Sequence, residues 1–466
     1  MNRAITISVL CAIPFFTLFS QNLLTLEQCR EAALKNNTQS KNAALTVQIA
    51  GYQQKEAFTN YFPKISALGS GFSSDKPIMS MEMDLSAMMQ PMMDVFTPAI
   101  IWGMQQGAPI DLNALAALGN AEPQKIEMLK NGIIAGVQAT QPIFAGGQIL
   151  NGNRLAKTGL EVSKLQKQIS DNEVLLETEH YFWQLVSLKE KMKTVENSEN
   201  MLARILSDVK IAVEAGLTTR NDFLRVELEQ NKLESGKLKL ENGLQMLKMA
   251  LGQKIGIAAD SFDIQQPEFD TFTDLVKTSV EENSTGLQNR PEYKLLNKSV
   301  EVSRLQHAME AGKNLPTIAV GAGYNYMNFD MHKDDGMKTV FAMVFATISI
   351  PVSDWWGGSH AIRRKKLEMI QTENTKKENT ELLLQQIQSV QYGLNEAYQQ
   401  VLLAKRSILS AEENLKVNQD NYNAGVLTLS DLLEAQNLLQ QSHDQYIEAG
   451  TQYFQKQAEW RQVSGQ

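Results

Sequence analysis

The chain has 466 residues, with 44 Lys and Arg against 52 Asp and Glu, which gives a formal net charge of -8. This mildly acidic balance argues against a nucleic-acid partner, because surfaces that bind nucleic acid are basic. The five histidines stand apart from one another and from acidic clusters, and the sequence has no nucleophile–base pair, phosphate-binding glycine loop or metal-ligand spacing, so we expect no enzyme, cofactor or bound metal.

Residues 1–20 have the pattern of a secretory signal peptide. Arg3 supplies a positive charge, an apolar run follows, and Ser20 is a small residue suited to a cleavage site. Cys29 is then the only cysteine of the exported chain, so no intramolecular disulfide can form and packing or oligomerisation must hold the fold. Its helical spacing with apolar neighbours predicts that Cys29 is buried. No later run of eighteen apolar residues occurs, so no membrane-spanning helix is predicted.

The exported chain is predicted to be two copies of one structural plan. Pro63 aligns with Pro316 before a strand-like segment, and Pro142 aligns with Pro351 shortly before a pair of glycines. A third match, AGLTTRNDFL against AGVLTLSDLL, follows in the same order in both halves. Three matches in one order indicate an internal duplication.

The first repeat covers residues 21–254 and is predicted to contain a helix, two strands, a long helix and a return helix. The strands are expected near 63–73 and 131–142, the long helix at 147–214 and the return helix at 220–254. At ~1.5 Å rise per residue the long helix would reach roughly 100 Å, which is longer than an ordinary globular domain needs. A connector of mixed polarity follows at 255–289.

A long insertion, residues 74–130, separates the two strands of the first repeat and is expected to be a loop. Eight methionines lie close together within it: Met79, Met81, Met83, Met88, Met89, Met92, Met93 and Met104. Thioether sulfur prefers Cu(I), so one hypothesis is a copper or silver efflux channel. The other hypothesis is that methionine fills irregular hydrophobic packing, and the lack of a nearby His or Cys favours it.

The second repeat covers residues 290–466 and follows the same plan. Its strands are expected near 316–328 and 338–350, its long helix at 357–423 and its return helix at 429–464. The long helix has an unbroken spacing of four and three between apolar residues, which predicts a coiled-coil seam. The seam comprises Leu383, Ile387, Val390, Leu394, Ala397, Val401, Ala404, Ile408, Ala411 and Leu415. The first repeat keeps this spacing with two polar interruptions, Thr178 and Glu199.

The predicted strands alternate in the way that membrane strands do. Over residues 317–326 one face would carry Ile, Val, Ala and Tyr, and the other would carry small or polar residues. A soluble sheet strand alternates in the same way, so both interpretations stay open. Four strands are too few to close a barrel, and open sheet edges cannot face lipid. A membrane barrel would therefore need strands from several chains.

The repeated motif predicts the same helix break in both halves. Gly216 and Gly425 can take the left-handed conformation that ends a helix. Asp222 and Asp431 would start the return helices, where a carboxylate is favoured by unpaired N–H groups. Capping alone would account for both carboxylates, and this explanation stays open beside a functional one.

With these features together, the chain resembles the outer membrane efflux family, the TolC-like proteins, over residues 24–464. The resemblance rests on the duplication, on the Pro-then-Gly-Gly junctions between strand and helix, and on the two AGxxTxxDxL breaks. It implies a mixed fold, in which a trimeric outer-membrane β-barrel with four strands per protomer continues into a long α-helical coiled-coil tunnel. It also implies a location in the outer membrane of a Gram-negative bacterium, with the helical tunnel in the periplasm. The implied partners are outer-membrane lipid, two further copies of the chain in a homotrimer, a periplasmic adaptor protein and an inner-membrane pump.

The resemblance assigns roles to residues around the breaks. Asp431 and Glu434 fall where the family has inward acidic rings at the periplasmic aperture. Asp222 and Tyr422 fall where polar links close the tip of the tunnel. In a homotrimer each lumen-facing carboxylate would become a ring of three, so these four residues are the candidate gate.

One position departs from the family pattern. Leu427 stands where a family member has Arg, which puts in doubt that the closed state uses the same ion pairs. Arg220 and Arg225 are the candidate replacements.

The expected function is that of an outer-membrane exit channel in a tripartite efflux or type I secretion system. Such a channel would pass small molecules or unfolded protein from the pump and adaptor to the outside, and the partner pump would supply the energy. The alternative is a periplasmic or surface coiled-coil protein with a structural role. The substrate is not encoded in this sequence, because the pump and the adaptor select it.

Overall fold

The computed structural model describes residues 22–106, 124–267, 272, 286–331, 337–352 and 354–465. The predicted signal peptide therefore lies outside the described residues. The chain divides into two compact units, and each unit takes segments from both repeats. The helical unit comprises Met1–Gln54, Leu155–Arg304 and Leu367–Gln466, and the sheet unit comprises Lys55–Arg154 and Leu305–Lys366.

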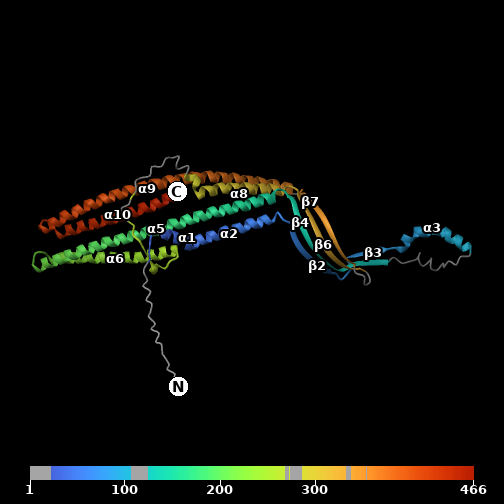
Figure 1. Cartoon of the computed structure of the whole chain (residues 1–466), viewed down its shortest axis with the longest axis horizontal. Helices are drawn as coiled ribbons and strands as arrows, with labels where there is room; N and C mark the ends of the chain where they lie inside the picture. Colours follow the sequence, from blue (N-terminus) through green and yellow to red (C-terminus); the bar gives the residue numbers. More distant parts are fainter. Residues whose placement is uncertain are drawn as a thin grey trace, which may run out of the picture. The chain divides into compact units, whose positions relative to one another are not determined.

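Two long helices and their return helices form most of the helical unit (Figure 1). The long helices are α5 (Gln148–Glu214) and α9 (Asp354–Asn423), with 67 and 70 residues. At ~1.5 Å per residue each is about 100 Å long. The return helices are α6 (Arg220–Ile255) and α10 (Leu429–Ser464), which run back along α5 and α9. Within the described residues, no helix combines the length and the hydropathy needed to cross a bilayer.

Shorter elements complete the helical framework. They are β1 (Asn22–Leu24), α1 (Leu26–Asn36), α2 (Thr38–Thr59), the short helix η1 (Ala259–Ser261), β5 (Phe262–Ile264) and α8 (Pro291–Lys313). A capping box between Thr25 and Gln28 begins α1. The connector returns to the start of the chain, because β5 pairs in parallel with β1.

The predicted seam positions of the long helices face inward. All ten seam residues of α9 are buried or half-buried, and Ile387 and Val401 are at most 1% exposed. The two polar interruptions in α5 are both satisfied, as buried polar groups must be. Thr178 donates its hydroxyl to the Val174 carbonyl at 2.7 Å, and Glu199 forms an ion pair with Lys237 of α6 at 2.8 Å.

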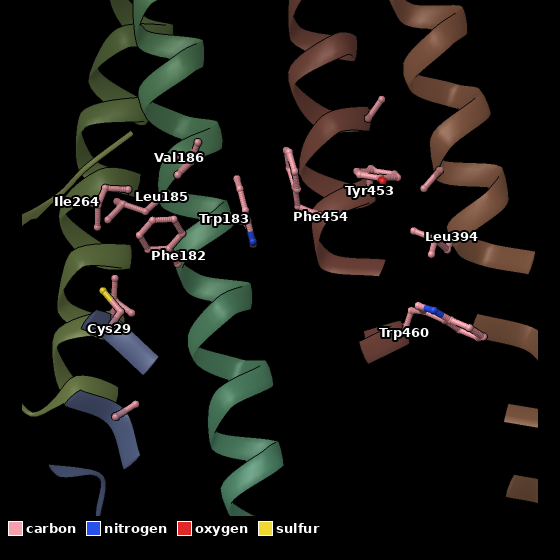
Figure 2. Close-up of a cluster of buried hydrophobic side chains, with 14 of the residues drawn as sticks. Cys29, Phe182, Trp183, Leu185, Val186, Ile264, Leu394, Tyr453, Phe454 and Trp460 are labelled. Carbon is pink, nitrogen blue, oxygen red and sulfur yellow. The ribbon is translucent and has the colours of Figure 1, made fainter. Parts of the chain in front are cut away.

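The main core joins the two repeats, with buried side chains from α5, α9 and the last turns of α6 and α10 (Figure 2). The ring of Trp183 on α5 stacks on that of Phe454 on α10, with centroids 3.9 Å apart. Cys29 lies in the same cluster with Phe182 and Leu185 and is fully buried, as its spacing predicts. Burial raises the pKa of its thiol to about 11, so this cysteine is a packing residue.

The sheet unit is built on four antiparallel strands in the order β2-β4-β6-β7. Their bounds are Lys64–Ser73, Gln124–Ala145, Thr317–Met331 and Met337–Ser349. The fifth strand, β3 (Met79–Met83), pairs with the first residues of β4. Outside this contact β2 and β7 are the two edges of the described sheet.

The register gives this sheet one apolar face. One row across the four strands consists of Ile65, Ala139, Ala322 and Val344, and the next two rows on that face hold only apolar residues, Gly and Tyr. Val344 is 85% exposed, so the chain itself does not cover this face at β7. Such a face needs an apolar environment, because burial of apolar surface is what stabilises it.

The opposite face is small and polar with interspersed aromatics. The row next to Val344 consists of Ser66, Gln138, Gly323 and Met343. Gly321 is needed here, because a Cβ at this position would lie 2.2 Å from the Phe345 ring. The alternation that the sequence predicts for residues 317–326 is therefore present in β6, with neighbours of matching character on both sides.

The Met-rich insertion differs from the expected loop. It contains β3 and a helix, α3 (Leu85–Gln105), whose N-cap Asp84 accepts a hydrogen bond from the Ala87 amide at 3.0 Å. The helix includes Pro91 and Pro98, and these prolines argue for a loop in the sequence. Residues 107–123 of the insertion lie outside the described part of the chain.

Candidate gate at the helix turns

The two helix breaks have the same backbone geometry. Gly216 and Gly425 have φ of +75° and +73°, the left-handed conformation that glycine adopts without strain. After the first glycine the Leu217 amide donates to the Ala212 carbonyl at 2.8 Å. The corresponding bond in the second turn joins Val426 and Asn421 at 2.9 Å. Both long helices therefore end in a Schellman motif, which satisfies the last carbonyls.

Both return helices also begin in the same way. Thr219 and Thr428 are their N-caps, and each forms a capping box with the aspartate three residues later. Asp222 accepts from the Thr219 amide at 3.2 Å and from its hydroxyl at 2.8 Å. Asp431 accepts from the Thr428 amide at 2.9 Å and from its hydroxyl at 2.7 Å. The capping role that the sequence left open is thus present at both aspartates.

These hydrogen bonds fix the charge of the two aspartates. The hydroxyl bonds of Thr218 and Thr219 hold the pKa of Asp222 below its ordinary value. The Thr428 hydroxyl has the same effect on the pKa of Asp431. Since a bond to the ionised form favours that form, both turns carry a stable negative charge at neutral pH.

The turns differ where Leu427 departs from the family pattern. Its counterpart in the first repeat is Thr218, whose hydroxyl donates to Asp222 at 2.7 Å. Leu427 cannot make this bond, so Asp431 keeps fewer donors than Asp222. The carboxylate of Asp431 is therefore less saturated and has more capacity to accept a bond from another group.

A side-chain bond joins the two repeats at this point. Arg225 Nη1 on α6 donates to Ser430 Oγ on α10 at 2.6 Å. Arg220 is exposed, and no ion pair or hydrogen bond of its side chain is found among the described residues. Of the two candidate cations, Arg225 is therefore the one that links the turns.

Tyr422 lies between the turns and the hydrophobic cluster behind them. It packs against a buried cluster that includes Val226 and Leu432. Burial raises its pKa, and the nearby negative charges of Asp222 and Asp208 raise it further. The phenol therefore stays protonated, and it stands close to the carboxylate with which the resemblance pairs it.

Glu434 occupies a different environment from Asp431. Its side chain is exposed, and within the described residues it has no ion pair or hydrogen bond. In the aligned repeats Glu434 corresponds to Arg225, so the two hairpins present opposite charges at the same position. Of the two candidate acidic residues, Glu434 is free and Asp431 is engaged as a cap.

Several contributing residues were not predicted as site residues. Ser430 accepts the hydrogen bond from Arg225, and Thr219 and Thr428 are the N-caps. The capping-box pattern of Thr and Asp in the sequence could have identified the two threonines. Leu217 and Val426 follow the two glycines and are 81% and 74% exposed. An apolar residue follows the glycine in both repeats, and this sequence pattern could have identified the two residues.

The described residues offer no metal centre at this place. No group of three or more His, Cys, Asp or Glu side chains that could hold a metal ion occurs in the part of the chain that the structure describes. The arrangement consists of an N-cap at each return helix, one hydrogen bond between the two repeats, and the exposed charge of Glu434, which is unpaired within the described residues. It is suited to positioning helix ends and to presenting charge.

The chain is similar to known proteins in part of its sequence and in its fold. Residues 284–466 match the family described as outer membrane efflux protein. No curated protein matches the sequence.

Solved structures resemble the chain along most of its length. The outer-membrane channel OprN has 12% identity and a TM-score of 0.73, covering 94% of this chain and 89% of its own. VceC, an outer membrane protein of Vibrio cholerae, has 14% identity and a TM-score of 0.70, covering 94% and 96%. CusC, studied for its transmembrane channel formation, has 13% identity and a TM-score of 0.74, covering 94% and 91%.

At these identities the structural likeness shows the fold, and the family match adds a sequence relationship over the second repeat. The predicted location, the outer membrane with a helical tunnel in the periplasm, is supported by this family match and agrees with these channels. A family of channels also agrees with the expected lack of enzymatic activity. The chain is thus similar to outer membrane efflux proteins, in sequence over residues 284–466 and in fold over 94% of its length.

Proposed function

We propose that the chain is the outer-membrane exit channel of a tripartite efflux or type I secretion system and acts as a homotrimer. It would pass small molecules or unfolded protein from a periplasmic pump–adaptor complex to the outside. The observation that carries this proposal is the sheet with one apolar face and two open edges.

The open edges account for the trimer. In lipid every backbone N–H and C=O must be paired, so a four-stranded sheet cannot stand alone in a bilayer. Pairing of β2 of one copy with β7 of the next removes both edges, and three copies give a closed barrel of about twelve strands. The Val344 face then meets lipid, and the Met343 face lines the lumen.

The helices supply the conduit. Each protomer contributes α5, α6, α9 and α10, whose seams pack inward as in a coiled coil. The turns at Gly216 and Gly425 form the inner end, where Asp431 and Glu434 become rings of three carboxylates. The bond between Arg225 and Ser430, together with Tyr422 beside Asp222, holds the hairpins of the two repeats together in the closed state.

The partners would meet the chain at the same end. Leu217 and Val426 project from the turns with large exposed apolar surface, which suits contact with a periplasmic adaptor. The channel has no energy source of its own in this proposal, and an inner-membrane pump drives transport. Alanine at both positions should weaken adaptor binding in a pull-down and leave assembly of the trimer intact.

Fractionation and conductance test the channel itself. We expect the protein to sediment with the outer membrane, to require detergent for release and to form pores in planar bilayers. Release in salt or carbonate without detergent would instead support the alternative, a periplasmic or surface coiled-coil protein. The apolar sheet face argues against that alternative, because a soluble coiled-coil protein would leave this face exposed to water.

One observation favours a narrower variant, a copper or silver efflux channel. Met79, Met81 and Met83 alternate along β3, so they share one face of the strand, and they are 50%, 52% and 38% exposed. Thioethers on one face can converge on a soft monovalent ion. Replacement of all three by leucine should then abolish binding of Ag(I), and unchanged binding would remove this variant.

A further inference from the structure

The first turns of α9 present exposed aromatic and basic side chains that conduction does not explain. Trp355 and Trp356 are 50% and 80% exposed. The run Arg-Arg-Lys-Lys at 363–366 follows, and Arg363 and Lys366 within it are exposed. All of these residues belong to the sheet unit.

Helical geometry places the tryptophans and the cations on one side of α9. A residue advances about 100° around the axis and ~1.5 Å along it. Trp356 and Arg363, seven residues apart, are thus about 20° apart in direction and roughly 10 Å apart along the axis. Trp355 and Lys366, eleven residues apart, differ by the same angle and by roughly 16 Å. The surface runs from an aromatic end to a basic end.

Local contacts hold the aromatic end, whereas Arg363 and Lys366 have no counter-charge among the described residues. Trp355 Nε1 donates to the Asn314 carbonyl at 3.0 Å, which fixes the start of the helix. The nearby Lys313 has its own counter-charge in Glu310 at 2.8 Å. By contrast, no acidic side chain of the described residues forms an ion pair with Arg363 or Lys366.

The first repeat shows that the fold does not need this pattern. Its junction also has a glycine pair, and α5 begins there without any tryptophan. The positions that align with Arg363, Arg364, Lys365 and Lys366 hold Gly152, Asn153, Arg154 and Leu155, so one of the four basic residues has a basic counterpart and Arg363 and Lys366 have none. The aromatic and basic surface is therefore a property of the second repeat alone.

We propose that this surface of α9 binds the headgroup of an anionic phospholipid in the leaflet that faces the periplasm. The inference rests on the proposed function, which puts the end of β7 at that side of the membrane. Trp355 and Trp356 take the interfacial position that tryptophan prefers, and Arg363 and Lys366 reach the phosphate layer. The apolar tryptophan pair selects a lipid over free phosphate, which offers it no apolar partner.

Lipid retention in detergent tests this proposal. The full-length protein is purified in an uncharged detergent doped with equal amounts of phosphatidylglycerol and phosphatidylethanolamine, and bound lipid is quantified by mass spectrometry. The wild type should enrich phosphatidylglycerol, and the variant Arg363→Gln with Lys366→Gln should lose roughly fivefold or more of that enrichment. Lys405→Gln with Arg406→Gln is the matched control, because it removes two exposed charges from the same helix.

The outcomes separate this proposal from the channel function. The lipid site is wrong if the 363/366 variant enriches phosphatidylglycerol as much as the wild type does, or if the wild type does not enrich it. If the protein still needs detergent and conducts, the channel function stands in either case. Loss of enrichment on addition of millimolar inorganic phosphate assigns the site to free phosphate and overturns the lipid. If the protein is soluble without detergent, both the channel function and the lipid site are wrong. Unchanged trimer content of both variants shows that the effect is not misfolding.

Discussion

Arg225 Nη1 and Ser430 Oγ are 2.6 Å apart and form the hydrogen bond that joins the return helix of the first repeat to that of the second. The bond lies at the end of the helices where both long helices reverse. It has no counterpart in the other repeat, because the position of Arg225 is taken there by Glu434. Opening by separation of the two hairpins would have to break it.

Arg225→Ala should therefore raise the open probability of the channel in planar bilayers. An exposed bond to a charged group contributes less than a buried one, so we expect a rise of roughly two- to fivefold per chain. Ser430→Ala should give the same rise, and the double variant should add nothing further. Arg220→Ala is the matched control, since its side chain has no bond in the described structure. An equal effect of Arg220→Ala would mean that net charge and not the bond sets the closed state.

Asp431 and Glu434 should differ in what their removal changes. Glu434 is free and exposed, so Glu434→Gln should lower the preference for cations over anions, most clearly at low salt, where charges are least screened. Asp431 is engaged with Thr428, so Asp431→Asn should chiefly destabilise the turn and cause spontaneous opening. Reversal potentials in a salt gradient measure the first effect. If alanine at both positions leaves cation selectivity unchanged, the proposal that Asp431 and Glu434 form an acidic gate is wrong.

The caps themselves should contribute equally in the two repeats. Thr219→Ala and Thr428→Ala each remove the N-cap of a return helix, with an expected cost of about 1 kcal/mol in the stability of that hairpin. Hydrogen exchange of the amides that follow each cap measures this locally. A loss at only one turn would show that the two hairpins are not equivalent in solution.

The two faces of β7 provide a test of the barrel with adjacent residues. Val344 lies on the apolar face and Met343 on the opposite one. Val344→Arg should cost about 2–4 kcal/mol if it faces lipid near the membrane centre, and the trimer should fail to assemble. Met343→Arg should assemble and change conductance. Equal amounts of assembled trimer from both variants would contradict the lipid-facing assignment of the Val344 face.

The helix ends were accessible to sequence reasoning because their causes are local. A left-handed glycine and a Thr–Asp capping box lie within a few residues of each other, and the duplication shows both twice. The alternation of β6 was accessible for the same reason, since the period of two is visible in a single strand. The partners of its side chains were not, because the Ala322–Val344 row depends on pairing between distant segments.

Two features were missed for different reasons. Residues 85–105 contain two prolines, which argue for a loop, and the helix α3 forms despite them. The link between Arg225 and Ser430 joins residues 205 positions apart, so periodicity in either segment gives no sign of it. The choice between Arg220 and Arg225 was open for this reason. The geometry of the packed helices settles which side chain reaches the other repeat.

The buried carboxylate of Glu179 makes stability depend on pH. Glu179 is 4% exposed, and Arg461 Nη2 lies 2.6 Å from one of its oxygens while Arg30 Nε lies 3.4 Å from the other. Burial raises its pKa, and the two arginines offset this only in part. The folded chain therefore binds the proton more tightly than the unfolded chain does.

The sign of the effect follows from linkage. A carboxyl with a raised pKa in the folded state contributes stability below its ordinary pKa, near 4.5, and this contribution is lost as pH rises through the folded value. Glu179→Gln removes the titration. The melting temperature of the variant minus that of the wild type should therefore increase as pH rises from about 4 to 7. Glu177→Gln, which removes a half-exposed carboxylate two residues away, is the control and should shift the profile less. A melting temperature that instead falls behind the wild type as pH rises would show that the pairing with Arg461 and Arg30 outweighs burial.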